Sequence, residues 1–448
     1  MTHTMQTSPF FTEADRPAAG QVWRNWAGNV TAHPRQFRQP RSEAEVQEIV
    51  RTAAQQGLKV RVVGAGHSFT PAAATDDVML SLDHLSGVQG FDPATGHVTV
   101  WAGTRLYDLN AMLHSLGRAQ ENMGDINRQS LAGAISTGTH GTGVTLGSVG
   151  TQVEAVRLID GLGNLRTISG EDARALSAAR LSLGALGVIT SVTLRTVPAY
   201  NLHMSIHAGK FSEMLALAPE YAARHRHFEF YWIPYTDAVQ VKRIDVTEEP
   251  ARPDGPMQVF NDRVLENSGV ELLCEISRRI PRANQAVCNV MGSLITPNTR
   301  TQASHDIFGS VRDVKFREME YGLPAEYLTR ALRELRGLMH RRRYPIAMPV
   351  EVRFARQDDV LLSTACGRDV GYIAIHAYQG VPCDDYFTEA EQVFLAHGGR
   401  PHWGKCHTLG AADFARLVPR FHEFLTVRDE YDPQRRFTNA YLERVLGD

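Results

Sequence analysis

Two glycine-rich stretches are the parts of this sequence whose composition suits the binding of a phosphate group. The first, Gly64-Ala-Gly66-His67-Ser68, follows a predicted strand, and the second runs from Gly133 to Gly150 with six glycines among its 18 residues. Glycine has no Cβ atom and tolerates positive φ, so backbone N–H groups in such segments can approach an anion. The alternative for either stretch taken alone is a tight turn at the end of a strand.

Neither stretch matches the two most familiar phosphate-binding fingerprints. The dinucleotide motif G-x-G-x-x-G begins at Gly64-Ala-Gly66 but has Phe69 in the place of its third glycine. The P-loop spacing is present from Gly133 to Gly138, but Thr139-His140 stands where a lysine and a hydroxyl residue should follow. The sequence therefore disfavours both a Rossmann dehydrogenase and a P-loop NTPase.

Charged side chains in two predicted strands could perform acid–base chemistry. Glu351 and Arg353 lie two residues apart in Pro349-Val-Glu-Val-Arg-Phe354, so on a strand they project from the same face. His376 projects from a second strand, and a neutral imidazole can accept a proton near neutral pH. The simpler interpretation of Glu351 and Arg353 is an ion pair on a solvated strand, worth under about 1 kcal/mol.

Cysteine usage argues against a disulfide scaffold and against a zinc module. The chain has five cysteines, an odd number, and none of them forms a Cys-x-x-Cys pair. A zinc site made of His402, Cys406 and His407 would lack a carboxylate ligand and a supporting Cys/His framework. We therefore expect no metal site.

Periodic patterns place the candidate residues in a chain of mixed strands and helices. Ser42 and Glu45 form a capping box ahead of a helix over 42–56, which Gly57 ends. Pro198 marks a predicted domain boundary, and from there to about residue 385 the sequence has a different pattern of predicted elements. The other expected elements are strands at 59–63, 78–82, 97–101, 153–159, 187–197, 228–233 and 372–377, and helices at 105–116, 171–179 and 325–342.

Composition excludes several classes of protein. The 448 residues include 47 Lys and Arg against 49 Asp and Glu, so the formal net charge is −2 and nothing points to nucleic acid as a partner. An apolar fraction of 43% is too high for a disordered chain. The N-terminus lacks the pattern of a signal peptide, and no run of 18 apolar residues occurs, so we expect a cytoplasmic protein without an integral membrane segment.

Taken together, the two glycine-rich stretches resemble the loops that wrap the FAD pyrophosphate in the vanillyl-alcohol oxidase-type flavoproteins. Further motifs are similar to those of the sugar-1,4-lactone oxidase branch, which includes the gulono-, arabinono- and galactono-1,4-lactone oxidases. They extend from about residue 20 to 443, nearly the whole chain. These motifs are Trp23-Arg-Asn-Trp26-Ala-Gly28, Arg41-Ser-Glu-Ala-Glu-Val46, Gly184-Ala-Leu-Gly187-Val-Ile-Thr190, His402-Trp403-Gly404-Lys405 and Asp432-Pro433 with Phe437-Thr-Asn439-Ala-Tyr441-Leu442.

The resemblance implies an α+β fold with a two-part FAD-binding domain of the vanillyl-alcohol oxidase type and an α+β cap domain for substrate. The FAD-binding domain would be residues 1–198 with a returning C-terminal segment, 386–448, and the cap would be 199–385. The cofactor would be FAD, joined covalently to His67 through the flavin 8α-methyl carbon. The residues expected to contact FAD are Gly64, Ala65, Gly66, His67, Ser68, Asp125, Gly133, Ser136, Thr137, Gly138, His140, Gly141, Gly143, Val188, Ile189 and Lys405.

The resemblance also implies roles for the catalytic candidates. Lys405 would lie near the flavin N1–C2 edge, and Arg353 would polarise the lactone carbonyl and stabilise the reduced flavin. Glu351 would hold a sugar hydroxyl, and the base could be either Glu351 or His376. Gly124, in Asn122-Met-Gly-Asp-Ile126, would lie over the flavin C4a face, where the absence of a side chain leaves a path for oxygen.

The expected reaction is oxidation of an aldono-1,4-lactone, of the L-gulono- or D-arabinono- type, at its C2 hydroxyl. The product would be ascorbate or an analogue, and oxygen would be reduced to hydrogen peroxide. Three alternatives stay open: an alditol or sugar oxidase, a lactone dehydrogenase with another acceptor, and a non-catalytic flavin-fold binding protein. The sequence also leaves open the stereochemistry of the substrate and the oligomeric state.

Overall fold

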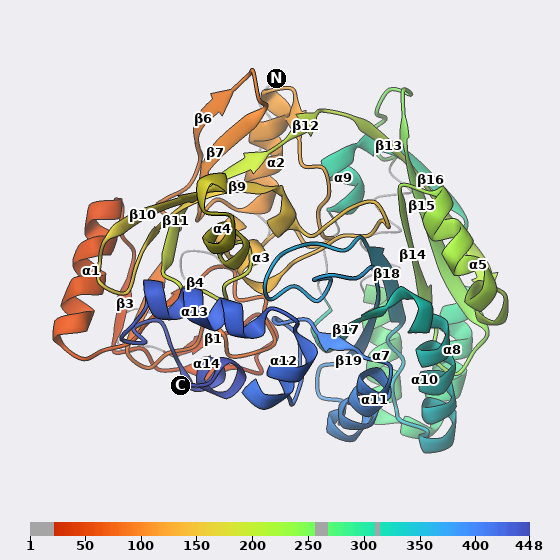
Figure 1. Cartoon of the computed structure of the whole chain (residues 1–448). Coiled ribbons are helices and arrows are strands. Elements are labelled where there is room, and N and C mark those ends of the chain that lie inside the picture. Colours follow the sequence, from red (N-terminus) through yellow and green to blue (C-terminus); the bar gives the residue numbers. More distant parts are fainter. Residues whose placement is uncertain (1–21, 256–267, 310–313) are drawn as a thin grey trace.

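The computed structural model of the protein describes residues 22–255, 268–309 and 314–448 (Figure 1). Two large apolar cores divide these residues into two lobes. We call residues 22–198 and 402–448 the first lobe, and the described residues of 199–401 the second lobe. The sequence predicts no signal peptide at the N-terminus. That segment, 1–21, lies outside the described residues.

The first lobe is built on a parallel three-stranded sheet and an antiparallel five-stranded sheet. The parallel sheet has the order β3-β5-β4 and the antiparallel sheet the order β10-β9-β11-β7-β6. Two short pairs, β1-β2 and β8-β12, complete it. The strands are β1 Trp23–Arg24, β2 Thr31–Ala32, β3 Gln36–Arg38, β4 Val60–Val63, β5 Val78–Ser81, β6 Val88–Asp92, β7 His97–Trp101, β8 Arg118–Ala119, β9 Val153–Ile159, β10 Leu165–Ser169, β11 Val188–Arg195 and β12 Val197–Pro198.

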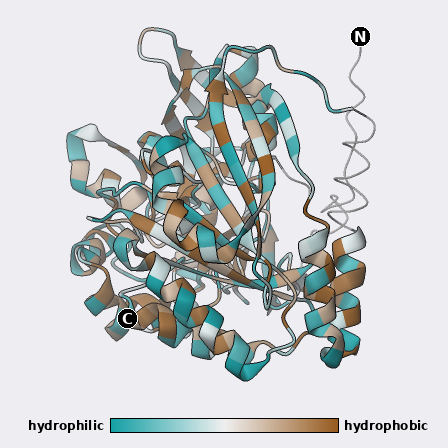
Figure 2. Cartoon of the chain, turned by 90° about the vertical axis from the view of Figure 1, so that its right-hand side faces the viewer, coloured by the Kyte–Doolittle hydropathy of each residue, from teal (hydrophilic) through white to brown (hydrophobic). Residues whose placement is uncertain are grey.

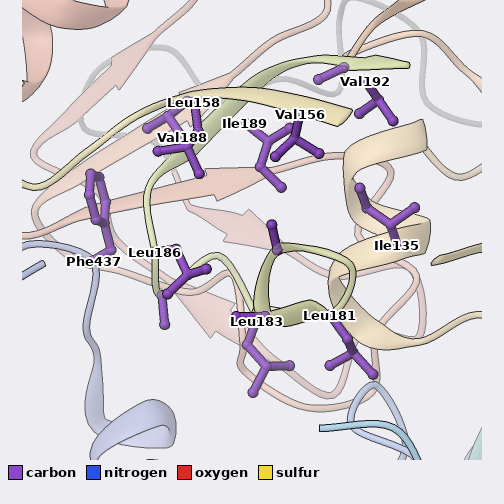
Figure 3. Close-up of a cluster of buried hydrophobic side chains, with 14 of the residues drawn as sticks. Ile135, Val156, Leu158, Leu181, Leu183, Leu186, Val188, Ile189, Val192 and Phe437 are labelled. Atoms are coloured by element: carbon purple, nitrogen blue, oxygen red, sulfur yellow. The ribbon is translucent and has the colours of Figure 1, made fainter. Parts of the chain in front are cut away.

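Helices from both ends of the chain cover these sheets. In Figure 1 the blue C-terminal helices α12 to α14 lie against the red-to-yellow N-terminal part, and Figure 3 shows Phe437 beside Val188, Leu158 and Leu186 in the shared core. The C-terminal segment thus returns to the first lobe. The helices are α1 Glu43–Gln55, α2 Leu106–Ser115, α3 Leu131–Thr137, α4 Ala173–Ala179, α12 Ala411–Leu417, α13 Phe421–Tyr431 and α14 Ala440–Leu446.

Helix α1 shows how closely local sequence determines an element here. Ser42 Oγ accepts a hydrogen bond from Glu45 N at 3.2 Å, as the capping motif predicts. The Glu45 carboxylate reaches back to the N–H of Arg41 at 2.9 Å, one residue earlier than in an ideal capping box. Val46, Val50 and Ala53 are buried on one face, in agreement with the predicted helical period.

The second lobe contains an eight-stranded sheet, in the described residues, with the order β16-β13-β15-β14-β18-β19-β17-β20. Every neighbouring pair in it is antiparallel. The strands are β13 Asn201–Lys210, β14 His227–Trp232, β15 Ala238–Thr247, β16 Asn298–Ala303, β17 Phe316–Pro324, β18 Val350–Ala355, β19 Val370–Tyr378 and β20 Arg400–Pro401. The helices are α5 Phe211–Arg224, α7 Val270–Arg279, α8 Asn284–Ser293, α9 Ser304–Phe308, α10 Leu328–Arg342 and α11 Asp384–Ala396.

The two faces of this sheet have different chemistry. Side chains alternate along a strand, so Val350, Val352 and Phe354 of β18 enter the apolar core of the second lobe. Glu351 and Arg353 then project from the opposite face, toward the first lobe. Figure 2 shows the same alternation of hydrophilic and hydrophobic residues along the long strands that face the viewer.

The limit between the lobes at the C-terminal side falls later than the predicted domain boundary at 385. Helix α11 places Tyr386, Phe387 and Phe394 in the core of the second lobe, and β20 pairs with β17 at Pro401. Trp403 is the next large side chain, and it belongs to the core of the first lobe. Within the described residues, no helix has both the length and the apolar character needed to cross a bilayer.

Candidate active site

A cleft in the first lobe is lined by residues of both glycine-rich stretches. It encloses about 1000 Å³, its open mouth included, between Gly64–Ser68 on one side and Gly133, Ser136 and Thr137 on the other. Gly184, Gly187 and Ile189 form a third wall.

Several glycines of the cleft stand where a side chain would not fit. A Cβ atom at position 64 would lie 2.3 Å from Ser130 Oγ. Gly66 has φ +66°, in the left-handed region that favours glycine, and so does Gly184 at +69°. The second stretch differs from a simple turn, because Gly133 and Thr137 lie in helix α3, which begins after Ser130 and ends at Gly138 with φ +79°.

Arg61 places a buried positive charge beside this cleft. Its guanidinium donates to the carbonyl oxygens of Ala72, Leu183 and Phe437, and burial lowers its pKa to about 10. Its remaining N–H donor is directed at Gly184 O at 3.5 Å, so Arg61 acts on the cleft through its charge and not as a hydrogen-bond donor. Glycine-lined walls with a buried cation fit a pyrophosphate group, and therefore a dinucleotide cofactor such as FAD.

His67 lies in the wall of the same cleft. Its ring centre is 5.4 Å from the ring of Trp26. Burial, helped by the charges of Arg105, Lys405 and Arg128, lowers the pKa of His67 to about 4. The imidazole is therefore neutral near pH 7, which is the nucleophilic form.

Strands β14, β17, β18 and β19 together present a buried polar face toward the first lobe. The register pairs Tyr231 with Glu351, Glu351 with Ala374, and Ala374 with Glu320, so these residues form one row across four strands. Pairs in the adjoining rows join Arg353 to Tyr372 and His376 to Glu318. The predicted Glu351, Arg353 and His376 thus lie on one face, as the two-residue spacing within each strand predicts.

Arg353 is the centre of an ion-pair network that joins the lobes. Its Nε donates to Glu229 Oε2 at 2.9 Å and its Nη2 to Asp125 Oδ2 at 2.5 Å, while Nη2 also contacts Glu351 Oε1. Burial opposes the charge, but Asp125, Glu351 and Glu229 raise the pKa of Arg353 well above its ordinary value. These contacts use Nε and Nη2 of the guanidinium.

Tyr231 bridges the same carboxylates from β14. Its hydroxyl lies 3.1 Å from Glu229 Oε1, 3.1 Å from Glu351 Oε1 and 3.3 Å from Asp125 Oδ2. Burial and the charges of Glu229 and Glu351 raise the pKa of Tyr231, so the phenol stays protonated. Lys242 Nζ lies 2.9 Å from Glu229 Oε1 and balances the charge of that carboxylate.

Lys405 and His376 share a second buried carboxylate, Glu318 of β17. Lys405 Nζ lies 2.5 Å from Glu318 Oε2, and His376 Nε2 lies 3.6 Å from Glu318 Oε1. His376 Nδ1 is 2.9 Å from the carbonyl oxygen of Pro349, so Nδ1 carries a proton and Nε2 faces the carboxylates. Glu351 Oε2 is 3.9 Å from the same Nε2.

His140, predicted as a FAD contact, reaches from the first lobe to the polar face of the second lobe. Its Nε2 is 3.2 Å from Glu320 Oε1, and its ring stacks on Tyr372 at 3.6 Å. Burial would raise the pKa of Glu320, but the charge and hydrogen bond of His140 outweigh burial. The pKa of Glu320 is therefore well below its ordinary value. The pair acts as a contact between the lobes.

His140, Glu320 and His402 lie close enough to resemble a metal site. The hydrogen bonds argue against this use. His402 Nδ1 accepts the N–H of Gly404 at 3.1 Å, so the neutral ring, whose pKa burial lowers to about 4, carries its proton on Nε2. A metal ligand at Nε2 would need the opposite tautomer.

The predicted FAD contacts fall into two groups. The cleft is lined by Gly64, Ala65, Gly66, His67, Ser68, Gly133, Ser136, Thr137 and Ile189. The others are not among its lining residues: Asp125, Gly138, His140, Gly141, Gly143, Val188 and Lys405. Asp125 binds Arg353, Val188 is fully buried in the apolar core, and Gly143 N donates to Phe354 O of β18 at 2.7 Å.

Four charged residues of the polar face were not predicted from the sequence, namely Glu229, Lys242, Glu318 and Glu320. A signal for the three carboxylates exists, because Phe228-Glu-Phe and Phe316-Arg-Glu-Met-Glu-Tyr321 place acidic residues inside otherwise apolar strands. Buried carboxylates of this kind need partners and therefore mark a polar site. The partners themselves come from distant segments.

Gly124 precedes Asp125 and packs against the second glycine-rich stretch. A Cβ atom at position 124 would lie 3.2 Å from the carbonyl oxygen of His140 and 3.2 Å from Thr139 Cγ2. The neighbouring backbone would have to move by a few tenths of an ångström to admit a methyl group. The space at this position is therefore narrow on the side of the second stretch.

Comparisons with known proteins agree with this architecture. The sequence profile of the D-arabinono-1,4-lactone oxidase family matches residues 192–445, and that of the FAD binding domain matches residues 34–169. The chain is 39% identical to an L-gulono-1,4-lactone dehydrogenase of Mycobacterium tuberculosis over 95% of this chain and 99% of that protein. It is 34% identical to L-gulonolactone oxidase of Mus musculus, over 95% and 98%.

A solved structure shows the same fold at lower sequence identity. Cholesterol oxidase from B. sterolicum superimposes with a TM-score of 0.81 at 19% identity, covering 99% of this chain and all of that chain. At this identity the likeness concerns the fold alone. The predicted α+β fold with an FAD-binding part and a large antiparallel cap is confirmed.

Proposed function

The chain belongs to the D-arabinono-1,4-lactone oxidase family of FAD-dependent enzymes, and from this premise we propose that it oxidises an aldono-1,4-lactone at its C2 hydroxyl. It is an FAD-dependent aldonolactone oxidoreductase. The substrate would be of the L-gulono- or D-arabinono- type, and the product ascorbate or an analogue. Bound FAD would accept the hydride from C2.

The observation that carries the proposal is the buried polar face beside the His67 loop. Arg353 would polarise the lactone carbonyl, while three carboxylates hold its guanidinium in place. Glu351 lies next to it and would hold a sugar hydroxyl. A rigid donor and acceptor at this spacing orient an uncharged polyhydroxy ring without requiring a charged substrate.

Removal of the C2 hydroxyl proton needs a base, and the contacts favour His376 over Glu351. Glu351 already accepts from Arg353 and Tyr231, which makes its carboxylate a weaker proton acceptor. His376 Nδ1 is held by Pro349 O, so in the neutral ring Nε2 is the nitrogen that accepts a proton. We assign His376 as the base and Glu351 as a substrate ligand.

His67 is proposed to hold the flavin covalently. Its position in the cleft wall and its lowered pKa, which keeps the imidazole neutral, both support bond formation at the flavin 8α-methyl carbon. The bond would fix the ring between the cleft and the polar face. A covalent histidyl link is also expected to raise the reduction potential of the flavin.

Oxygen is the proposed electron acceptor, with hydrogen peroxide as product. Gly124 enters this assignment through the family resemblance alone, in which a position without a side chain leaves oxygen a path to the flavin. A lactone dehydrogenase with another acceptor is the second candidate. It is favoured by the name of the M. tuberculosis relative, at 39% identity.

A substrate panel tests the proposal. Purified protein is offered L-gulono-, D-arabinono- and L-galactono-1,4-lactone and the alditols xylitol and sorbitol, in air with peroxide detection and in parallel with an artificial dye as acceptor. The proposal predicts lactone-dependent peroxide. Dye reduction without peroxide identifies the dehydrogenase, and turnover of alditols alone contradicts the lactone assignment.

A further inference from the structure

Glu318 is a buried carboxylate that contacts two proposed catalytic residues. Its side chain is 7% exposed. One oxygen contacts Lys405 Nζ at 2.5 Å and the other faces His376 Nε2 at 3.6 Å. Burial would raise the pKa of Glu318, but Lys405 and His376 outweigh it and lower the pKa to about 2.

The backbone of β17 holds the same loop that carries Lys405. Cys406 N donates to the carbonyl oxygen of Glu318 at 2.8 Å, and His402 N donates to that of Glu320 at 2.9 Å. The loop 402–406 is therefore hydrogen-bonded along β17 on both sides of Lys405. The lysine is fixed by its main chain and by its ammonium group, and both contacts come from one strand.

Lys405 in turn lies against the segment that follows His67. Phe69 N donates to Gly404 O at 2.7 Å, and Lys405 Nζ is 5.4 Å from the centre of the Phe69 ring. The charge of Lys405 is also one of the causes that lower the pKa of His67. A change in the position or effective charge of this ammonium therefore alters the electrostatic potential at the wall of the cofactor cleft.

We propose that Glu318 is a positioning residue that fixes the Lys405 ammonium and sets how much of its positive charge acts on the bound flavin. The proposal rests on the proposed function only in placing the flavin beside Lys405. A carboxylate in contact with an ammonium cancels part of its field at a third site. Loss of the carboxylate charge should therefore make the flavin easier to reduce.

The test compares flavin midpoint potentials, measured by slow reduction in the presence of reference dyes. Glu318→Gln should raise the two-electron potential by about 30 mV or more, which is a tenfold change in the reduction equilibrium. In a Lys405→Met background the same substitution should have less than a third of this effect. The reason is that a buried Glu318 without Lys405 tends to be neutral already.

Two further variants make the test specific. Glu320→Gln removes a neighbouring carboxylate of the same strand and face that pairs with His140, and it should change the potential by less than a third as much. Glu318→Asp keeps the charge but withdraws it from Lys405 by one methylene group, and it should raise the potential by a smaller amount. If Glu318→Gln does not retain flavin, Glu318→Asp takes its place in the test.

Three results would overturn the proposal: unchanged potentials in both Glu318 variants, equal shifts with and without Lys405, or equal shifts in Glu318→Gln and Glu320→Gln. The measurement needs only bound flavin and no lactone. A protein that shows the predicted shifts but is not reduced by any lactone would refute the proposed substrate and leave the role of Glu318 intact.

Discussion

The Nη2 atom of Arg353, on strand β18 of the second lobe, donates to Asp125 Oδ2 of the first lobe at 2.5 Å. Tyr231 reinforces the same carboxylate from β14 at 3.3 Å. Asp125 therefore connects the segment that contains Gly124 to the residue proposed to bind substrate. Its interaction with Arg353 is a contact that was not predicted from the sequence, where Asp125 is expected only as a FAD contact.

Replacement of Asp125 by Asn should weaken substrate binding while FAD remains bound. One of three carboxylates that orient Arg353 loses its charge, so we expect kcat/KM to fall about 10- to 100-fold, or about 1.4 to 2.7 kcal/mol. Steady-state kinetics and the flavin absorbance of the purified variant provide the measurement. Asp245→Asn, at a half-exposed carboxylate that binds His225, is the matched control. Loss of flavin with normal kcat/KM in the loaded fraction would restore the cofactor role.

Replacement of His67 by Ala should make the flavin extractable. We expect acid precipitation of the unaltered protein to leave yellow colour in the pellet and that of His67→Ala to release FAD into the supernatant. The neutral imidazole, with a pKa of about 4, is the physical reason for expecting a bond. His33→Ala, an exposed histidine of the same lobe, should behave like the unaltered protein. Release of flavin from the unaltered protein would refute the link.

Replacement of Gly124 by Ala should slow reoxidation by oxygen more than reduction by lactone. The new methyl group must displace the backbone near Thr139 and His140 slightly, which we expect to cost about 1 kcal/mol of stability. Stopped-flow measurements of both half-reactions separate this packing effect from an effect on oxygen. Equal reoxidation rates in the two proteins would count against the oxygen path.

Acid should destabilise the polar face in a defined pH range. The pKa of Glu318 is lowered in the folded protein, so its contribution to stability is complete above the ordinary value of about 4.5 and is lost as pH falls toward about 2. The melting temperature of Glu318→Gln should therefore fall less between pH 5 and pH 3 than that of the unaltered protein. Glu48→Gln, at an exposed glutamate of α1, should follow the unaltered protein, and parallel curves for all three would contradict the assignment.

Much of the fold was predictable from local sequence pattern, because many of its features depend only on residues that are neighbours in the chain. The cap of α1 at Ser42 and the common face of Glu351 and Arg353 are of this kind. The pairing of Glu318 with Lys405 was not predictable, since it requires the register of β17 on β19 and the return of loop 402–406 to that strand. The contacts of His140 with Glu320 and Tyr372 were not predictable for the same reason, because those residues lie more than 170 positions away in the chain.

The central claim is that the bound flavin takes hydride from an aldono-1,4-lactone oriented by Arg353 and Glu351. The most direct measurement is anaerobic mixing of the flavin-loaded protein with L-gulono- or D-arabinono-1,4-lactone while the oxidised-flavin absorbance is recorded. The account predicts rapid and saturable bleaching that is slowed at least 100-fold in Arg353→Lys, since an ammonium cannot replace the guanidinium fork. An unbleached flavin at saturating concentrations of both lactones, or bleaching that is unchanged in Arg353→Lys, would contradict it.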